Sequence, residues 1–294
     1  MIDKLEFLLA LARERHFGRA AESCGITQPT FSAGIKQLEN QFGLLLVQRG
    51  SRFGGFTPEG ERVLEWARRI VGDSRAMKQE IDSLKRGLVG HLRIAVIPSA
   101  LPMVAQLTTP YRARHQNVRF TVLSRTSIEI LQMLDDLEID AGISYLDNEP
   151  LGRVTTVPIF REQYRLVTSK NDRFGDRASV TWAEVGELPL CLLTPDMQNR
   201  RIIDRMLRSV GANPAPTLES NSMIVLFAHV RTGRWSSIMS ANIAETLGLS
   251  DEIRLIPVVD PEISQMIGLI VPPREPTTPL VTALIAEARR FATA

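Results

Sequence analysis

The segment from residue 27 to residue 36 brings together side chains that can read the edges of base pairs. Gln28 can pair with adenine through two hydrogen bonds, and the hydroxyls of Thr30 and Ser32 can reach a base edge or a phosphate. Lys36 follows one helical turn beyond Ser32, where its ammonium group can reach a phosphate. This set of groups suits the major groove of DNA if it lies on the first turns of a helix.

The flanking residues predict such a helix. Thr27 is suited to the N-cap position, and Pro29 is tolerated in the first turn of a helix that extends to about Asn40. Phe31 falls among the residues expected to face the groove. The residues expected on the buried side are Ile35, Leu38 and Phe42. A recognition helix is therefore predicted to begin near Thr27.

Two shorter features complete a DNA-binding unit. Residues before Gly25 have the spacing of short helices, so the predicted recognition helix follows another helix after a tight turn. Residues 49–56, RGSRFGGF, are basic and rich in glycine, as a hairpin turn would be. Arg49 and Arg52 would supply cations to the flanking backbone or the minor groove. We therefore predict a winged helix-turn-helix in residues 1–58.

A long amphipathic helix is predicted next, over residues 59–89. Its apolar face is too long for one helix to bury alone, which predicts pairing with a second copy of the chain. The alternative is a connector that packs on its own domain. The residues of this face are Val63, Leu64, Ala67, Ile70, Val71, Met77, Ile81, Leu84 and Leu88.

Residues 90–294 alternate between strand and helix patterns, which predicts an α/β domain with mainly parallel strands. The overall class is thus α+β multidomain. The clearest strands are residues 92–97, 118–123 and 164–169, and the clearest helices are residues 127–137 and 200–210.

Composition excludes several classes of protein. Apolar residues make up 44% and charged residues 23% of the 294-residue chain, which can bury a core, and the net charge is only +2. The balance is +3 in residues 1–90 and −1 in the remainder, so DNA binding must depend on where the charges lie. Two cysteines predict neither a disulfide framework nor a metal site, and favour the cytoplasm. No signal peptide or membrane span is expected.

The chain resembles the LysR-type transcriptional regulators. The residues that carry the resemblance are the segment HFGRAAESCGITQPTFSAGIKQLENQFGLLL and the later RGSR and TPEG. The resemblance covers the whole chain. It implies a regulatory domain of the periplasmic-binding-protein type over residues 90–294, with subdomain I near 90–161 and 267–294 and subdomain II near 162–266. It also implies a DNA-binding homo-oligomer, in which a dimer of dimers meets a near-palindromic operator and RNA polymerase is a possible partner. A small-molecule effector, with no cofactor, would control this assembly.

One residue departs from the family pattern in the predicted recognition helix. The family commonly has an arginine directly after the serine, where this chain has Ala33 followed by Gly34. Recognition should therefore depend more on Gln28, Ser32 and Lys36. The alternative for Gln28 is an ordinary solvated residue of the first helical turn.

The resemblance also implies where the effector would bind. Three loops, at residues 97–100, 124–127 and 195–200, would place polar groups at the ends of strands and the starts of helices, which favours a small carboxylate or another small anion. For the serines of these loops, the alternative is that they only cap helices. The residues implied are Ser99, Ala100, Thr126, Ser127, Gln198 and Asn199, with Tyr145 and Trp235 as walls.

Peroxide sensing is a separate possibility, because the DNA-binding segment is especially similar to the peroxide-responsive branch of the family. That branch carries a reactive cysteine in the loop that corresponds to residues 195–200, and this chain has none there. Cys191 lies in an apolar strand, where burial would raise the pKa of its thiol and make it inert. The regulatory domain is also similar to family members associated with formate dehydrogenase operons, which would fit a very small carboxylate.

Three alternatives to an effector-controlled regulator stay open. These are a thiol-based redox sensor, a solute-binding module that does not bind DNA, and an enzyme. The enzyme has little support, because the chain has four histidines and lacks the sequence signatures of nucleophilic, phosphate-binding and metal-dependent hydrolases. No catalytic and no metal-binding residue is therefore predicted.

Overall fold

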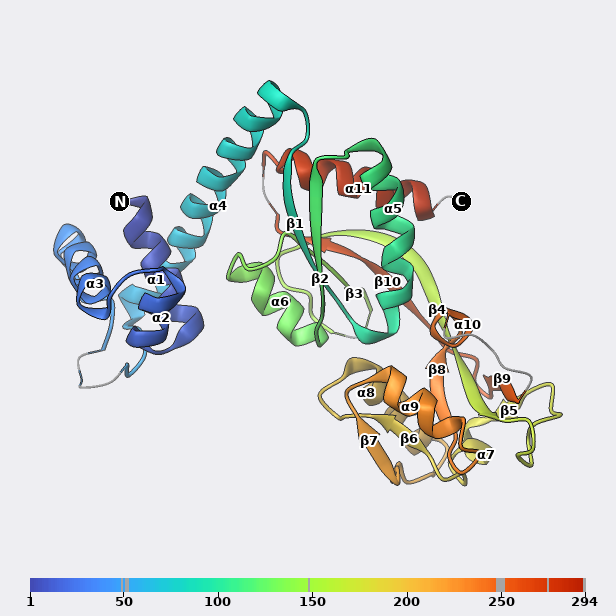
Figure 1. Cartoon of the computed structure of the whole chain (residues 1–294). Helices are drawn as coiled ribbons and strands as arrows, with labels where there is room; N and C mark the ends of the chain where they lie inside the picture. Colours follow the sequence, from blue (N-terminus) through green and yellow to red (C-terminus); the bar gives the residue numbers. More distant parts are fainter. Residues whose placement is uncertain (49, 51–52, 148, 247–251, 274, 293–294) are drawn as a thin grey trace. The chain divides into compact units, whose positions relative to one another are not determined.

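The structure is a computed structural model that describes residues 1–48, 50, 53–147, 149–246, 252–273 and 275–292. The chain forms two units (Figure 1). The first comprises residues 1–89 with the short segments 135–138 and 274–279, and the second comprises the rest.

The first unit begins with three short helices. They are α1 (Ile2–Glu14), α2 (Phe17–Ser23) and α3 (Gln28–Phe42). His16 caps α2, because its Nδ1 accepts from the backbone N–H groups of Gly18 and Arg19. Helix α3 ends at Gly43, whose φ of 68° suits a residue without a side chain. The tight turn between α2 and α3 gives the predicted helix-turn-helix.

The core of this unit contains one residue that was expected on its surface. Phe31 is fully buried among the rings of Phe7 and Phe17, so the expectation that it faces the groove is wrong. Phe42 is 40% exposed and does not continue the buried side of α3. The buried face of α3 therefore includes Phe31 and leaves out Phe42, because its apolar stripe starts one turn earlier than predicted. The core residues contributed by the three helices are Leu5, Leu8, Leu9, Ala10, Leu11, Ala20, Ala21, Phe31, Ile35 and Leu38.

Gly34 allows α1 and α3 to approach closely. A Cβ at this position would lie 2.7 Å from Cδ2 of Phe7, inside the contact distance. Glycine is unfavourable in a helix by about 1 kcal/mol relative to alanine. Here that cost is offset by the packing of an aromatic ring directly on the helix backbone.

The segment after α3 is tied back to it. One carboxylate oxygen of Glu39 accepts from the backbone N–H groups of Leu46 (2.9 Å) and Val47 (3.2 Å). Val47 pairs with Phe56 in an antiparallel bridge, which closes the segment that contains the predicted basic hairpin. Glu39 therefore fixes the approach to the wing and does not face solvent as a free charge.

The long helix α4 (Pro58–Arg86) follows, and its two halves differ. Thr57 caps it by accepting from the N–H of Gly60 at 2.9 Å. The first half buries Leu64, Ala67 and Val71 in the core of the first unit. The second half exposes the apolar side chains Met77 (56%), Ile81 (44%) and Leu84 (81%). That half of the predicted seam thus has an apolar face that no described residue of the chain covers.

The second unit is built on a large mixed sheet and a separate pair of short strands. The strands are β1 (Gly90–Val96), β2 (Val118–Ser124), β3 (Ala141–Tyr145), β4 (Thr155–Ser169), β5 (Val180–Thr181), β6 (Cys191–Leu193), β7 (Leu218–Ser220), β8 (Ser237–Ser240), β9 (Ile253–Val259) and β10 (Ser264–Val271). The helices are η1 (Pro98–Met103), α5 (Val104–Arg114), α6 (Ser127–Asp135), α7 (Trp182–Val185), α8 (Gln198–Ser209), α9 (Met223–Val230), α10 (Ala241–Thr246) and α11 (Pro279–Ala292).

The order of the strands corrects the expectation of a mainly parallel sheet. The main sheet has the order β2-β1-β3-β10-β4-β9-β5, with β8 also paired to β4, while β6 and β7 form a separate parallel pair. Strand β1 is parallel to β2 and β3, but β10 and β4 are antiparallel to their neighbours. The departure arises because β10 enters antiparallel to β3 and β4 enters antiparallel to β10, and β4 then continues into the other half of the unit.

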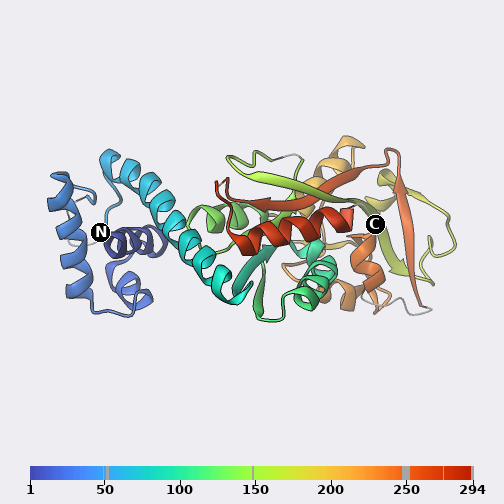
Figure 2. The ribbon, with the colours of Figure 1, turned by 90° about the horizontal axis from the view of Figure 1, so that it is seen from above.

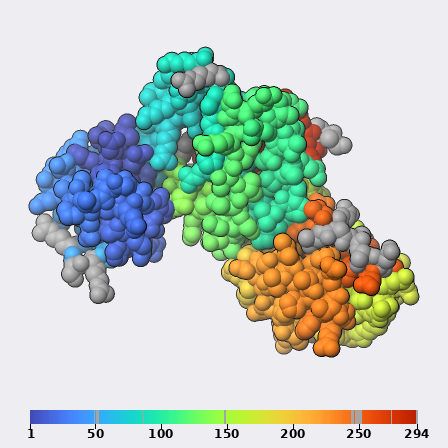
Figure 3. Space-filling model, in the orientation of Figure 1, coloured from blue at the N-terminus to red at the C-terminus, as the bar shows by residue number. Residues whose placement is uncertain are grey.

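Strand β4 is the clearest link between these two halves, which we call subdomains I and II. Up to Gln163 it pairs with β10 of subdomain I, and from Tyr164 it pairs with β8 and β9 of subdomain II. The predicted subdomain limit at residues 161 and 162 falls beside this change of partners. The space-filling view shows the green and orange parts of the unit as two lobes that meet along a furrow (Figure 3).

Helices cover the sheet of subdomain I. Helix α11 runs along the sheet (Figure 2) and packs against α5, where the Tyr111 hydroxyl donates to the Leu280 carbonyl at 3.0 Å. Arg114 of α5 also forms an ion pair with the buried carboxylate of Glu287 on α11. Among the described residues, no helix combines the length and apolarity that crossing a bilayer requires. The same part of the chain contains no cluster of three potential metal ligands.

Candidate functional site

The predicted DNA-reading residues lie on the solvent side of α3. Gln28, Pro29, Thr30 and Lys36 are exposed, and Ser32 is half-buried. Their exposure leaves amide, hydroxyl and ammonium groups available on the first turns of the helix. The structure therefore places these residues on one helix, α3, with their polar groups toward solvent, as the sequence predicted.

The start of α3 keeps its backbone donors available. Thr27 occupies the N-cap position, but its hydroxyl lies 3.0 Å from the hydroxyl of Thr30, and no side-chain cap is formed among the described residues. The N–H groups of Gln28 and Thr30 are thus open to a phosphate, whereas Pro29 between them has no N–H to offer. Ala33 is exposed on the next turn, where an arginine is common in the family that the sequence resembles. Arg49 and Arg52 lie outside the described residues.

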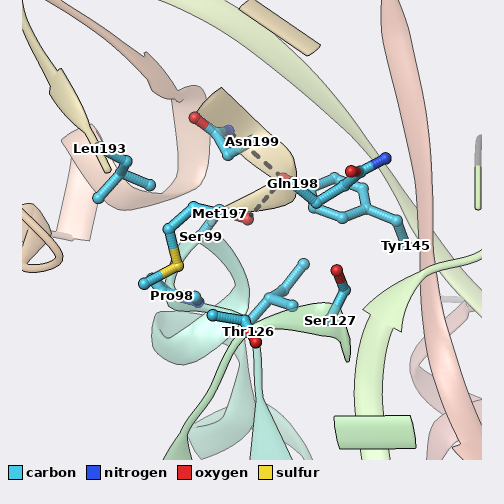
Figure 4. A pocket seen from close by; sticks show the side chains of 10 residues that line it. Pro98, Ser99, Thr126, Ser127, Tyr145, Leu193, Met197, Gln198 and Asn199 are labelled. Carbon is cyan, nitrogen blue, oxygen red and sulfur yellow. Dashed lines mark hydrogen bonds between the residues drawn. The ribbon is translucent and has the colours of Figure 1, made fainter. Parts of the chain in front are cut away.

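A small pocket lies between the two subdomains of the second unit (Figure 4). Its cavity volume is about 10 Å³, close to the space that one water molecule needs, so the pocket suits only a very small ligand. The lining residues are Ile97, Pro98, Ser99, Thr126, Ser127, Tyr145, Leu193, Met197, Gln198 and Asn199.

Two of the predicted pocket residues lie elsewhere. Ala100 is buried in η1, because the helical turn directs its methyl group into the core and leaves Ser99 toward the pocket. Trp235 packs on subdomain II, where its indole N–H donates to Thr217 at 2.9 Å and its ring meets that of His229 edge-on. Trp235 was predicted as a wall of the pocket, but it is not among the residues that line the pocket in this structure.

Tyr145 links the groups around the pocket. Its hydroxyl donates to Oε2 of Glu162 at 2.8 Å. The same hydroxyl oxygen lies 3.0 Å from the hydroxyl oxygen of Ser99 and accepts from the side-chain amide nitrogen of Asn199 at 3.3 Å. Ser99 and Tyr145 belong to subdomain I and Asn199 to subdomain II. The hydroxyl of Tyr145 is thus a hydrogen-bonding junction between the two subdomains.

A buried acid lies behind this junction and was missed in the sequence. Burial raises the pKa of Glu162 above its usual range, although hydrogen bonds from Tyr145 and its neighbours act in the opposite direction. Its Oε1 and the hydroxyl of Tyr164 have no hydrogen-bond partner among the described residues. The alternation of side chains along a strand could have indicated this burial, because Glu162 lies on the same face of β4 as the buried residues Tyr164 and Leu166.

The start of α6 contains two neighbouring hydroxyls with different tasks. Thr126 caps the helix, since its backbone N–H donates to Glu129 (2.8 Å) and its hydroxyl accepts from the N–H of Glu129 (3.2 Å). The hydroxyl of Ser127 donates to Oε2 of Glu149 at 2.7 Å. The capping alternative is therefore wrong for Ser127, and the residue that caps α6 is Thr126.

Glu149 also pairs with Arg201, and sequence reasoning named neither residue. Arg201 lies on the first turn of α8, and its guanidinium forms an ion pair with the Glu149 carboxylate. Nothing in the local sequence marks this pair, because Glu149 is in the connection between β3 and β4 and lies 52 positions from Arg201. Both side chains are half-buried or more, with exposed fractions of 20% for Glu149 and 31% for Arg201.

The cysteines have the environment of unreactive thiols. Burial raises the pKa of Cys191 to about 11, and its thiol faces the carbonyl of Leu226. Burial also raises the pKa of Cys24. The predicted rise in the pKa of Cys191 is confirmed, and a thiolate is therefore scarce at either position at neutral pH.

A helix-turn-helix unit followed by a long helix and a two-subdomain unit with a small polar pocket defines a DNA-binding regulator with a sensor domain. Residues 2–61 match the family described as bacterial regulatory helix-turn-helix protein, lysR family, and residues 85–293 match the LysR substrate binding domain. The chain belongs to the LysR family of DNA-binding transcriptional regulators, as the sequence predicted.

Similar proteins include members of the peroxide-responsive branch. The chain is 27% identical over 278 residues to the DNA-binding transcriptional dual regulator OxyR of Escherichia coli strain K12, covering 94% of this chain and 90% of that protein. It is 26% identical over 276 residues to the hydrogen peroxide-inducible genes activator of Dickeya chrysanthemi, with coverages of 94% and 90%.

Solved structures share the fold over the full length. A full-length OxyR from Pseudomonas aeruginosa, in a variant with one cysteine replaced by aspartate, has a TM-score of 0.75 at 23% identity, covering 99% of both chains. Full-length CbnR in complex with its target DNA has a TM-score of 0.63 at 19% identity, covering 99% of this chain and 100% of that one. Similarity at this level shows the fold, and the site must be argued from the residues of this chain.

Proposed function

We propose that this regulator acts on DNA in the cytoplasm as a homo-oligomer, and that a small carboxylate or another small anion controls it from the pocket between subdomains I and II. The observation that supports this proposal is the convergence of polar side chains from both subdomains on one small pocket. Ser99 and Ser127 come from subdomain I, and Gln198 and Asn199 from subdomain II.

The electrostatics of the pocket favour a small anion. The N-termini of α6 and α8 contribute Ser127 and Gln198 to its lining, and helix N-termini carry a partial positive charge. The small volume restricts the ligand to a few non-hydrogen atoms. A ligand that bonds to both walls would change how the subdomains pack, which would shift the population of DNA-bound arrangements.

The long helix supports the homo-oligomer. The exposed apolar residues Met77, Ile81 and Leu84 recur along one side of α4 at helical spacing. Burying such a face against the same face of a second copy pairs two recognition helices, as a near-palindromic operator requires. A dimer of such dimers, and contact with RNA polymerase, belong to the same proposal.

Thermal unfolding of the full-length protein tests the effector class. Formate, acetate and glycolate are added separately and compared with their amides, because a ligand that binds the native state raises the melting temperature. We expect at least one acid, and none of the amides, to stabilise the protein. Ser99→Ala should reduce that stabilisation, whereas the matched variant Ser209→Ala, on an exposed hydroxyl of α8, should not. Stabilisation by the amides alone, or equal stabilisation of both variants, would contradict the proposal.

A further inference from the structure

Among the described residues, Glu149 is the one carboxylate that two pocket-side donors from different subdomains hold together. Ser127 of subdomain I donates to its Oε2 at 2.7 Å, and Arg201 of subdomain II pairs with its Oε1. Ser127 itself lines the pocket, and Arg201 bonds to Gln198, another lining residue. Glu149 and Arg201 do not line the pocket themselves, but the Glu149 carboxylate links Ser127, a lining residue of subdomain I, to Arg201, which bonds to the lining residue Gln198 of subdomain II.

Arg201 is positioned without the help of Glu149. Its Nε donates to Oε1 of Gln198 at 2.9 Å, and its Nη1 donates to the carbonyls of Asp196 (2.7 Å) and Pro195 (3.3 Å). These three acceptors belong to the same loop and helix start as Arg201, so they fix the plane of the guanidinium within subdomain II. The remaining nitrogen, Nη2, is the one that meets Glu149. A rigid guanidinium with one free edge is well suited to bind a carboxylate.

Ser127 is likewise available for a ligand. The capping role at α6 is filled by Thr126 and Glu129, so the Ser127 hydroxyl is not needed to satisfy the helix terminus. Figure 4 shows the hydroxyl of Ser127 directed into the pocket and that of Thr126 directed away from it. Removal of Glu149 would leave a hydroxyl donor and a guanidinium edge facing the same small space.

Glu149 itself is the movable member of the three. It lies in the connection between β3 and β4, outside any helix or strand, whereas Ser127 and Arg201 are both on the first turns of helices. Withdrawal of its side chain therefore requires no change in the helices that hold the two donors.

We propose that Ser127 and Arg201 form the carboxylate-binding subsite of the effector pocket, and that Glu149 occupies this subsite as an internal substitute until the carboxylate of an effector replaces it. The proposal rests on the pocket being the effector site and adds which groups bind the charge. After this replacement, the carboxylate of the ligand, in place of that of Glu149, links Ser127 of subdomain I to Arg201 of subdomain II. Effector binding and subdomain packing are coupled for that reason.

The substitute acts as a tethered competitor. A tethered group is present at an effective concentration in the millimolar range, so it lowers the apparent affinity for a free carboxylate. The apparent Kd scales inversely with the fraction of protein whose subsite is free. If Glu149 occupies the subsite nine-tenths of the time, its removal tightens acetate binding about tenfold.

Isothermal titration of the full-length protein with acetate tests this proposal. Glu149→Gln should bind acetate about tenfold more tightly than the unmodified chain, because the amide is a poor partner for the guanidinium. The matched control is Glu187→Gln, which makes the same charge change at an exposed ion pair with Arg173. It should leave the affinity for acetate unchanged. Acetamide, the neutral analogue, should gain nothing in either variant.

Second-site variants identify the donors. In the Glu149→Gln background, Ser127→Ala and Arg201→Gln should each reverse the gain in acetate affinity. Equal acetate affinity in Glu149→Gln and Glu187→Gln, an equal gain for acetamide, or a gain that survives both second-site variants would overturn the subsite. These outcomes can be told apart from failure of the proposed function. They compare the affinities of variants for acetate, whereas the proposed function fails when no acid raises the melting temperature in a way that depends on Ser99.

Discussion

Tyr145 donates its hydroxyl to Glu162 at 2.8 Å across the point where β4 passes from one subdomain to the other. Glu162 is 1% exposed. Such surroundings raise the pKa of the Glu162 carboxyl group, because burial penalises the charge more than the nearby hydroxyls stabilise it. The link between the subdomains therefore includes a group whose protonation depends on pH.

This relationship predicts how stability changes with pH. The folded-state pKa of Glu162 is raised from its ordinary value of 4.5, so the native state keeps a proton that the unfolded chain releases. Its contribution to stability is present in full below pH 4.5 and is lost as pH rises toward the folded-state pKa, at a rate of at most about 1.4 kcal/mol per pH unit. Glu162→Gln, which mimics the neutral acid, should remove this loss.

Urea unfolding between about pH 4 and pH 8, followed by tryptophan fluorescence, measures the effect. The free energy of unfolding of the unmodified chain should fall relative to that of Glu162→Gln as pH rises. The exposed control Glu187→Gln should follow the unmodified chain. Parallel curves for all three proteins would show that Glu162 has no raised pKa.

Gly34→Ala should destabilise the DNA-binding unit although alanine is the better helix former. The added Cβ would lie 2.7 Å from the ring of Phe7, and overpacking a core usually costs about 1–3 kcal/mol. We expect this cost to exceed the gain of about 1 kcal/mol in helix propensity. Thermal unfolding of the single variant and of the pair Phe7→Leu with Gly34→Ala measures the coupling. The pair should be less destabilised than the sum of the two single changes, and strict additivity would exclude the contact as the cause.

Gln28→Ala should weaken specific DNA binding by about 1–3 kcal/mol and leave non-specific binding nearly unchanged. The reason is that the exposed amide can form a two-bond contact with one base, while the phosphate contacts come from other groups. Retardation of the DNA upstream of the chain's own gene, compared with a shuffled sequence, measures the difference. Gln41→Ala, the same change at the far end of α3, serves as the control. Equal loss on both DNA sequences would assign Gln28 to the backbone of the DNA.

Ile81→Glu should convert the oligomer to smaller species. A charge placed on the exposed apolar face of α4 would have to be buried in the proposed helix pair, which is costly without a partner. Lys78→Glu, three residues earlier on an exposed position of the same helix, is the control. Sedimentation velocity at micromolar concentration measures the mass. An unchanged mass for Ile81→Glu would place the interface elsewhere.

The sequence predicted the elements well and the contacts between distant residues poorly. The spacing around Gln28 and Lys36 located an exposed recognition helix, because periodicity and capping are local properties of the chain. The same periodicity misplaced Phe31, since the choice of buried face depends on Phe7 and Phe17 of other helices.

The pocket was predicted in part for the same reason. Ser99 and Ser127 stand next to strand ends, and the resemblance to the family indicated them. Glu149 and Arg201 are far apart in the sequence, and their pairing depends on the approach of the two subdomains. Trp235 was assigned to the pocket from its place in the chain, whereas the hydrogen bond of its indole to Thr217 decides where it lies.

The most direct test of the account is the length of the DNase I footprint on the upstream DNA, measured with and without a saturating small carboxylate. The full-length protein should change its footprint when the acid is present, and Arg201→Gln should bind the same DNA with a footprint that the acid does not alter. A footprint of the unmodified protein that stays the same at every concentration of an acid shown to bind it would contradict control from this pocket.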